Sequence, residues 1–388
     1  MTRALSSRDR MLAAVRSATP DYVPCCFMLF GALQRRYRDR FEFVDRQLEM
    51  GLDAYLQLPA GLSLRFDPGV EVRDWREEPP GEPYPVIHRE YTTPSGTLHT
   101  SVRETEDWPH GVGVPLFDDF SISRAHKHLI TGPDDLPALR HLLAPPDPQE
   151  VANAGKHAEE ARAFAANRQV MTVSQWGMLF DAACWLCGIE ELILMAATQP
   201  EFVDELLGII HEWNRARMAA VLEDGPDLLV RRAWYETVDF LSPAVYRRLI
   251  LPRLKADADQ AHEAGARLGL ITTCAYTPLL GMYLEAGIDV LIGVDPVQDT
   301  RADFALTKER LGGRVALWGG VNGFVSVEQQ EPDDVRQAVR DAMQTLGPGG
   351  GFILSPVDNV VEPSDRVWAN VAALIDEWRA CRDHVPLA

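Results

Sequence analysis

Short apolar runs alternate with longer amphipathic segments along most of the second half of the chain. Each apolar run has the length of a buried strand, and each amphipathic segment has the length and periodicity of a surface helix. The pattern predicts strands at 169–174, 227–232, 267–273, 290–293, 315–318 and 352–355, followed by helices at 180–197 and 200–222, 242–264, 278–286, 301–311, 332–346 and 366–382.

The first sixty residues extend the same alternation. Ser6 or Ser7 can cap a helix that ends near Arg16. Apolar positions then predict a buried strand at 22–30, a helix at 33–50 and a strand at 53–58. About eight strand–helix units predict an α/β fold, a (β/α)₈ TIM barrel forming a single domain over residues 1–388. A doubly wound open sheet is the alternative, although no Gly-x-Gly-x-x-Gly motif follows the first strand.

Residues 68–130 have a different pattern, with polar and apolar positions alternating and many Pro, Thr, Glu and Arg residues. Two alternating runs flank the turn signal Thr93-Pro94-Ser95-Gly96. This arrangement predicts a β-hairpin, which we interpret as an excursion from the barrel near residues 68–130.

Composition narrows the classes of partner. The chain has 388 residues, 46% of them hydrophobic, and a formal net charge of −19. Such an acidic protein repels nucleic acid and anionic lipid, so neither is an expected partner. An anionic small molecule stays possible because a local arginine cluster can bind one. The N-terminus has no apolar signal segment and no run spans a membrane, which predicts a cytoplasmic protein with its six cysteines as thiols or ligands.

In a barrel of this kind the active site lies at the carboxyl ends of the strands. One such corner holds Arg232, Trp234, Tyr235 and Glu236. Glu236 is a candidate general acid, base or metal ligand, with Tyr235 beside it at the catalytic face. Trp234 and Arg232 are candidates for the substrate-binding wall. The structural alternative is an Arg–Glu pair with aromatic packing.

Other strand ends supply further candidates. Cys274 is a candidate ligand or nucleophile, and a buried thiol is its structural alternative. Asp358 is a candidate ligand or base, and an aspartate in a turn is its alternative. Trp176, Tyr276 and Asn322 are expected to line the substrate pocket, by stacking or hydrogen bonding.

Several short segments resemble the uroporphyrinogen decarboxylase superfamily, which includes the decarboxylase and zinc-dependent, corrinoid-linked methyltransferases. The resemblance covers nearly the whole chain and depends on the order and spacing of its segments. They include 93–98, 130–136, 188–192, 199–203, 241–243, 285–291 and 349–356. The resemblance implies a (β/α)₈ barrel with a pocket at its carboxyl face.

The methyltransferases of this superfamily bind Zn²⁺ through His-x-Cys after one strand and Cys after the last. This chain keeps Cys274 but has Thr272 at the histidine position and Asp358 at the last position. The resemblance therefore implies zinc held by Cys274 and Asp358, with Glu236 as a third ligand. It also implies that a separate protein carries the corrinoid, because no segment here resembles a corrinoid-binding domain.

The decarboxylases carry two arginines after the first strand, an aspartate after the second and a histidine after the last. Here no arginine precedes Arg35 in the first loop, and Asp358 occupies the histidine position. Our leading hypothesis is thus a methyltransferase-like enzyme that moves a methyl group between a small substrate and a corrinoid or other carrier. A decarboxylase or other lyase acting on a small acid or tetrapyrrole is the first alternative, and a non-catalytic binding barrel is the second. The resemblance also suggests a homodimer.

Overall fold

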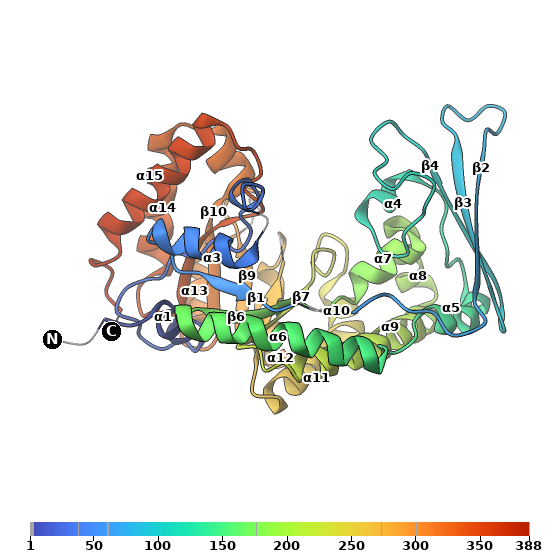
Figure 1. Cartoon of the computed structure of the whole chain (residues 1–388), viewed down its shortest axis with the longest axis horizontal. Helices are drawn as coiled ribbons and strands as arrows, with labels where there is room; N and C mark the ends of the chain where they lie inside the picture. Colours follow the sequence, from blue (N-terminus) through green and yellow to red (C-terminus); the bar gives the residue numbers. More distant parts are fainter. Residues whose placement is uncertain are drawn as a thin grey trace. The chain divides into compact units, whose positions relative to one another are not determined.

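The computed structural model describes residues 4–37, 39–59, 62–175, 177–272, 274–298 and 302–387. The chain divides into two compact units (Figure 1). Unit 1 comprises Met1–Ala60, Ala152–Trp176 and Val221–Ala388, and unit 2 comprises Gly61–Val151 and Gly177–Ala220. The single domain predicted for residues 1–388 stays a prediction, and the two units are described separately.

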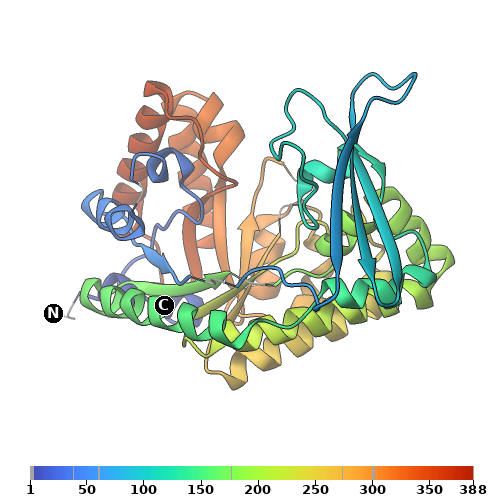
Figure 2. The same cartoon turned by 45° about the vertical axis from the view of Figure 1, so that its right-hand side comes forward.

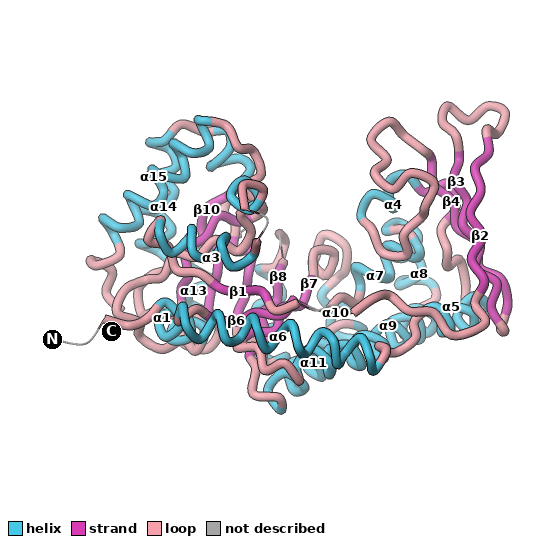
Figure 3. The backbone as a smooth tube through the Cα atoms, viewed as in Figure 1, coloured by secondary structure: helices cyan, strands magenta, loops and turns pink. Residues whose placement is uncertain are grey.

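Unit 1 is built on a seven-stranded parallel sheet, drawn in magenta in Figure 3. Its strand order follows the sequence, because each strand is hydrogen-bonded to the preceding strand of the sheet. Crossover connections that contain helices join these parallel strands. The strands are β1 (Tyr55–Gln57), β6 (Met171–Gln175), β7 (Leu228–Arg232), β8 (Arg267–Ile271), β9 (Val290–Val294), β10 (Ala316–Asn322) and β11 (Phe352–Val357).

Helices alternate with these strands, as the apolar periodicity predicts. In Figure 1, α14 (orange) and α15 (red) lie side by side, and α14 also packs against β10. The helices of unit 1 are α1 (Ser7–Val15), α2 (Gly31–Gln34), α3 (Arg40–Glu49), α6 (Pro148–Arg168), α10 (Pro243–Leu249), α11 (Leu251–Glu263), α12 (Leu280–Ala286), α13 (Phe304–Leu311), α14 (Pro332–Leu346) and α15 (Asp365–Cys381), with single turns η2 (Thr277–Leu279) and η3 (Gly323–Val327).

The strand predicted at 22–30 is reduced to a single parallel bridge between Cys25 and Leu354. Hydrogen bonds still join this segment to both ends of the sheet. The Leu354 carbonyl accepts from the Cys26 N–H at 3.0 Å, and the Cys25 carbonyl accepts from the Asp53 N–H at 2.8 Å. The sheet therefore has seven strands where eight were expected, and closure into a complete (β/α)₈ barrel stays a prediction.

One face of the parallel sheet encloses an apolar core. Residues two apart on successive strands meet there, including Met171 and Val173 on β6 and Leu228 and Val230 on β7. This alternation follows from the two-residue period of a strand. Helix α1 adds Met11 and neighbouring apolar residues to the same core.

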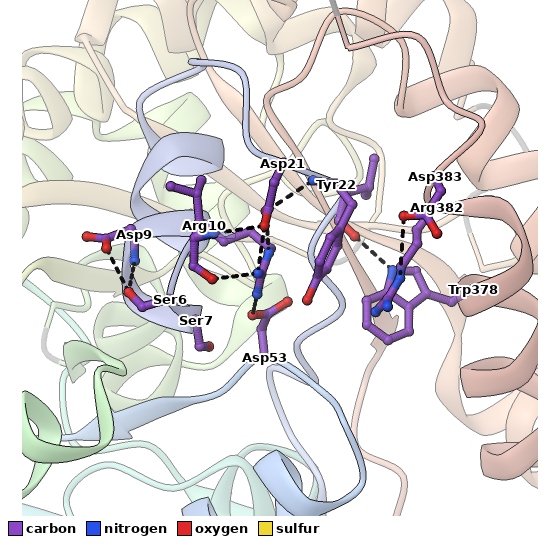
Figure 4. Close-up of polar contacts among 12 residues, drawn as sticks. Ser6, Ser7, Asp9, Arg10, Asp21, Tyr22, Asp53, Trp378, Arg382 and Asp383 are labelled. Carbon is purple, nitrogen blue, oxygen red and sulfur yellow. Dashed lines mark hydrogen bonds and ion pairs between the residues drawn. The ribbon is translucent and has the colours of Figure 1, made fainter. Parts of the chain in front are cut away.

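A buried ion network holds α1 in place (Figure 4). The Arg10 guanidinium donates to Asp21 at 2.6 and 3.0 Å and to Asp53 at 2.7 Å. It also lies 3.8 Å from the centre of the Tyr22 ring, and the Arg382 guanidinium lies 4.1 Å from that ring. Both charged ends of the Arg10–Asp53 pair are buried, so each charge depends on the other.

Unit 2 contains a four-stranded antiparallel sheet, whose long strands stand out in Figure 2. The predicted hairpin at Thr93–Gly96 is confirmed, because β3 and β4 pair across this turn. The excursion is larger than a hairpin, since β2 and β5 add to its two edges. The strands are β2 (Glu71–Glu77), β3 (Val86–Thr93), β4 (Gly96–Arg103) and β5 (Ala125–Lys127).

Helices complete unit 2, and α5 packs against β4. Cys184 and Cys187 are both buried in α7. No helix in the described part of the chain is both long and apolar enough to span a lipid bilayer. The helices are α4 (Asp119–Arg124), α5 (Leu136–Leu142), α7 (Phe180–Cys187), α8 (Ile189–Thr198) and α9 (Pro200–Leu222), with the turn η1 (Pro133–Asp135).

Candidate active site

A cavity in unit 1 lies where β8, β9 and β11 end, at the edge of the sheet where the chemistry was predicted. The cavity itself has a volume of about 20 Å³, and the wider space among its lining atoms, about 360 Å³, includes open solvent. Apolar groups make most of the wall, including Met28, Leu29, Ile271, Ile292, Trp234 and Trp318. The polar groups on the wall are Thr272, Ser355 and Asp358.

The wall around Met28 is fixed by hydrogen bonds at both ends of this residue. The Met28 N–H donates to Ser355 Oγ at 3.0 Å, and the Tyr55 hydroxyl donates to the Met28 carbonyl at 2.6 Å. Trp318 is fully buried and donates from Nε1 to the Cys26 carbonyl at 2.8 Å. These hydrogen bonds fix the positions of the Cys26 and Met28 backbone groups next to the cavity.

Asp358 is the carboxylic acid of the cavity wall, and it directly follows β11. Its backbone is left-handed, with φ of 65°, a conformation that aspartate tolerates better than most residues. The Gln298 side-chain amide donates a hydrogen bond to its carboxylate. Burial raises the pKa of Asp358, while the Gln298 hydrogen bond opposes that rise. Such a carboxyl group suits proton transfer.

A second buried carboxylate, Asp295, follows β9 and fixes the loop that carries Gln298. It accepts from the Val297 N–H at 2.7 Å and from the Gln298 N–H at 3.4 Å. Asn322, at the end of β10, donates to Asp295 at 2.6 Å and accepts from the Val325 N–H. Burial raises the pKa of Asp295. Side-chain hydrogen bonds thus join the ends of β9, β10 and β11, and Asn322 is one of the residues that join them.

Glu236 pairs with Arg231 in the interior of unit 1. Arg231 Nη2 lies 2.8 Å from each of its carboxylate oxygens, and Arg231 Nε lies 3.3 Å from Asp257 on α11. All three side chains are fully buried. The arginine therefore points from β7 toward the helix layer, and Glu236 compensates its charge there.

The next residue on β7, Arg232, faces the opposite way. Its guanidinium carbon lies 3.9 Å from the centre of the Trp234 ring and 5.8 Å from that of Tyr235. Trp234 itself lines the cavity. Tyr235 packs edge-to-face on Phe240 at 5.4 Å. The structure thus brings Arg232, Trp234 and Tyr235 together, with the guanidinium next to the cavity wall.

The corner after β8 holds Cys274 and Tyr276. The Cys274 thiol is half-buried and lies 3.4 Å from an Asp239 carboxylate oxygen, while Tyr276 is fully buried. Ala275 between them has a left-handed backbone with φ of 53°. Such strained positions concentrate at functional sites, so this corner remains a candidate even though its thiol bonds to a neighbouring loop.

The predicted zinc ligands do not form one set. In the part of the chain that the structure describes, no three His, Cys, Asp or Glu side chains are placed to hold a metal. Cys274 contacts Asp239, Glu236 contacts Arg231 and Asp358 contacts Gln298. These residues as arranged do not fit a three-ligand zinc site, and zinc binding stays a prediction.

Trp176 lies outside the described residues, so its predicted place in the pocket stays a prediction. The sequence did not single out Met28, Trp318 or Gln298, which the structure places in or next to the cavity. Position after a strand was a usable signal for Asp295 and Ser355. Gln298 carries no such signal, because only the fold of its loop brings it to Asp358.

The parallel sheet and its edge cavity define an α/β protein of the kind that binds ligands at strand ends. Residues 112–380 match the family described as uroporphyrinogen decarboxylase (URO-D). Because this match covers more than half of the chain, the protein belongs to the uroporphyrinogen decarboxylase family. The superfamily resemblance seen in the sequence is thereby confirmed.

Solved structures extend the comparison. A methyltransferase from Methanosarcina mazei is similar over 97% of this chain and 99% of its own, with 16% identity and a TM-score of 0.59. A B12-independent methionine synthase from Shewanella sp. W3-18-1 has 11% identity and a TM-score of 0.37, over 57% of this chain and 65% of its own. A 3-keto-D-glucoside 4-epimerase from E. coli has 12% identity and a TM-score of 0.34, over 58% of this chain and 86% of its own. No curated protein matches the chain. The first likeness establishes the fold alone.

Proposed function

We propose that this protein is a methyltransferase-like enzyme that moves a methyl group between a small molecule and a separate carrier. The observation that carries the proposal is a single carboxyl group, Asp358, on the wall of an otherwise mainly apolar cavity at the strand ends. The end-to-end likeness in fold to a methyltransferase supports the same class.

In this proposal the cavity binds a small molecule that carries a methyl group on oxygen, nitrogen or sulfur. Trp234, Trp318 and Met28 exclude water and contact the apolar part of the substrate. Asp358, whose pKa burial raises, gives a proton to the heteroatom as the bond from that atom to the methyl carbon breaks. A corrinoid on a separate protein would supply the atom that accepts the methyl group.

Gln298 has a defined part in this step. Its amide holds the Asp358 carboxyl toward one orientation and stabilises the carboxylate left after proton transfer. The Asp295–Asn322 pair keeps the Gln298 loop in position. In the reverse direction the same carboxylate removes a proton from the acceptor heteroatom.

Decarboxylation of a small acid is the second candidate, and Arg232 favours it. A guanidinium beside the Trp234 wall can bind a substrate carboxylate or a neighbouring acidic group. Loss of carbon dioxide leaves an electron pair on carbon, and protonated Asp358 can supply the proton that this carbon takes up.

One experiment separates these reactions. Purified protein is incubated with a panel of small methyl ethers, methylamines and thioethers together with reduced cobalamin, and formation of methylcobalamin is followed by absorbance. Parallel samples with small carboxylic acids are assayed for carbon dioxide. Methyl transfer that Asp358→Asn abolishes supports the proposal, with the exposed Asp341→Asn as control. Carbon dioxide release that depends on Asp358 would show that the protein is a decarboxylase instead of a methyltransferase. Saturable binding without turnover in either assay would indicate a binding protein.

A further inference from the structure

A second hollow adjoins the cavity, where β1 ends and α3 begins. We refer to it as the groove, lined at its floor by Phe30, Phe43, Tyr55 and Leu58 and at its polar positions by Gln34, Arg40 and Gln57. Met28 and Leu29 line both the groove and the cavity. A ligand longer than the cavity can therefore continue into the groove over these two residues.

A ring contact and two hydrogen bonds form the boundary between the groove and the cavity. Tyr55 lines the groove, and its ring meets Trp318 of the cavity wall edge-to-face at 5.9 Å. Its hydroxyl holds the Met28 carbonyl, and Ser355 of the cavity wall holds the Met28 N–H. The unbranched Met28 side chain, which lies between these two anchors, can adapt to a ligand that passes over it.

Arg40 gives the groove a charge preference. Its guanidinium lies 4.9 Å from the Phe41 ring centre, and Arg40 Nη2 donates a long hydrogen bond of 3.5 Å to the His157 carbonyl. Among the described residues no carboxylate pairs with Arg40, whereas Arg46 on the same helix pairs with Glu49. A half-buried guanidinium with no acidic partner, next to the amides of Gln34 and Gln57, is a group that binds an anion.

The overall charge of the protein makes this local preference informative. A chain with a net charge of −19 repels small anions in general. An anion that binds therefore needs a specific cationic contact, and the apolar floor of the groove supplies a second contact for the body of such a molecule.

From this arrangement we propose that the groove is a subsite for the far end of the substrate, which is an apolar or aromatic molecule ending in a carboxylate, sulfonate or phosphate. The anionic end pairs with Arg40, the apolar body lies on Phe43 and Tyr55, and the reacting group reaches the cavity past Met28. This inference rests on the proposed function, because it assigns the other end of the same substrate.

Two fluorescent probes test the subsite without any turnover. 8-Anilinonaphthalene-1-sulfonate has an apolar body with an anion, and N-phenyl-1-naphthylamine has the same body without the anion. We expect Arg40→Gln to weaken binding of the sulfonate about tenfold and to leave binding of the neutral probe unchanged, since a hydrogen bond to a charged group is lost. Arg46→Gln, on the same helix, is expected to leave both affinities unchanged. Phe43→Ala should weaken both probes.

The controls decide how a negative result is read. Circular dichroism and thermal unfolding of each variant establish that it is folded, and Arg40→Met, which also removes the charge, serves if Arg40→Gln does not fold. Equal affinity of the sulfonate for wild type and Arg40→Gln, or the same loss in Arg46→Gln, would overturn the subsite. Asp358→Asn should bind the sulfonate as wild type does. If the probes bind as expected but no methyl transfer occurs, the subsite stands and the proposed function is wrong. If methyl transfer occurs but Arg40→Gln binds the sulfonate as wild type does, the proposed function stands and the subsite is wrong.

Discussion

Arg231 Nη2 lies 2.8 Å from both carboxylate oxygens of Glu236, inside the layer between β7 and the helices. With Asp257 also 3.3 Å from this arginine, the pair is part of a fully buried charge network. A carboxylate so placed supports the fold, because its loss leaves a buried guanidinium with less compensation.

Glu236→Gln is therefore expected to lower the free energy of unfolding by roughly 3–5 kcal/mol, as in other buried ion pairs that lose one partner. Urea unfolding followed by circular dichroism measures this loss, with the exposed Glu309→Gln on α13 as control. The folded variant should keep turnover within about tenfold of wild type. A variant of normal stability that loses turnover more than about a hundredfold would instead place Glu236 in the chemistry, as the sequence suggested.

Asp358→Asn is expected to lose turnover by a factor of roughly 10²–10⁴, the usual contribution of a general acid or base. The same change should stabilise the protein at pH 7. Burial raises the Asp358 pKa above its usual 3.8, so the folded chain binds this proton more tightly than the unfolded chain does. Stability therefore falls as pH rises from that usual value through the raised folded value.

Thermal unfolding at several pH values checks this sign. The variant should exceed wild type in stability near pH 7, and the difference should vanish near pH 3, where the carboxyl group is protonated in both states of the wild type. Asp295→Asn is the contrast, because burial also raises the Asp295 pKa but this carboxylate accepts three N–H groups, and an amide NH₂ set against one of these donors should destabilise the fold. Lower stability of Asp358→Asn at pH 7 would mean that its ionised form is favoured by the fold.

Arg10→Met is expected to destabilise unit 1 by about 3–5 kcal/mol, because Asp53 would stay buried without its partner. The double replacement Arg10→Met with Asp53→Leu should recover part of this loss, since no charge is then left uncompensated in the interior. Chemical unfolding of the two single variants and the double variant gives the coupling energy between the residues. Additive effects would show that the pair contributes no interaction of its own.

Gly293 forms a close approach between the ends of β8 and β9. A Cβ added there would lie 1.8 Å from the Thr272 carbonyl oxygen, and its φ of 98° is left-handed. Gly293→Ala should thus cost more than about 3 kcal/mol, through both clash and backbone strain. Gly281 on α12 has open space around it, so Gly281→Ala should leave stability unchanged or raise it by up to about 1 kcal/mol. Equal unfolding midpoints for the two variants would contradict this account.

Metal analysis tests the predicted zinc site. With Cys274 next to Asp239 and Glu236 paired with Arg231, we expect less than one zinc per chain after purification in zinc-containing buffer. The result that would restore the prediction is one zinc per chain that Cys274→Ala removes. Cys381→Ala, which changes a thiol of similar exposure elsewhere in unit 1, should leave any zinc content unchanged.

Several features of the fold could be predicted from the sequence because they depend on local periodicity. Apolar runs of strand length predicted β6 to β11, and the Thr93–Gly96 turn predicted the hairpin of unit 2. The strand predicted near Cys25 failed because backbone pairing depends on the neighbouring strands, and only Cys25 meets Leu354 in register. The sequence could also place Asp358 at a strand end facing the site, since position after β11 is a local property.

The sequence by itself determined the family, the parallel α/β class and the edge of the sheet that bears the cavity. Only the tertiary structure decided which of two neighbouring arginines lies on the cavity side of β7. Arg231 and Arg232 are adjacent in sequence, but successive side chains of a strand point to opposite faces, so one meets Glu236 and Asp257 while the other meets Trp234. Likewise, Gln298 and Asp358 are sixty positions apart, and the folding of two loops onto one edge makes them partners.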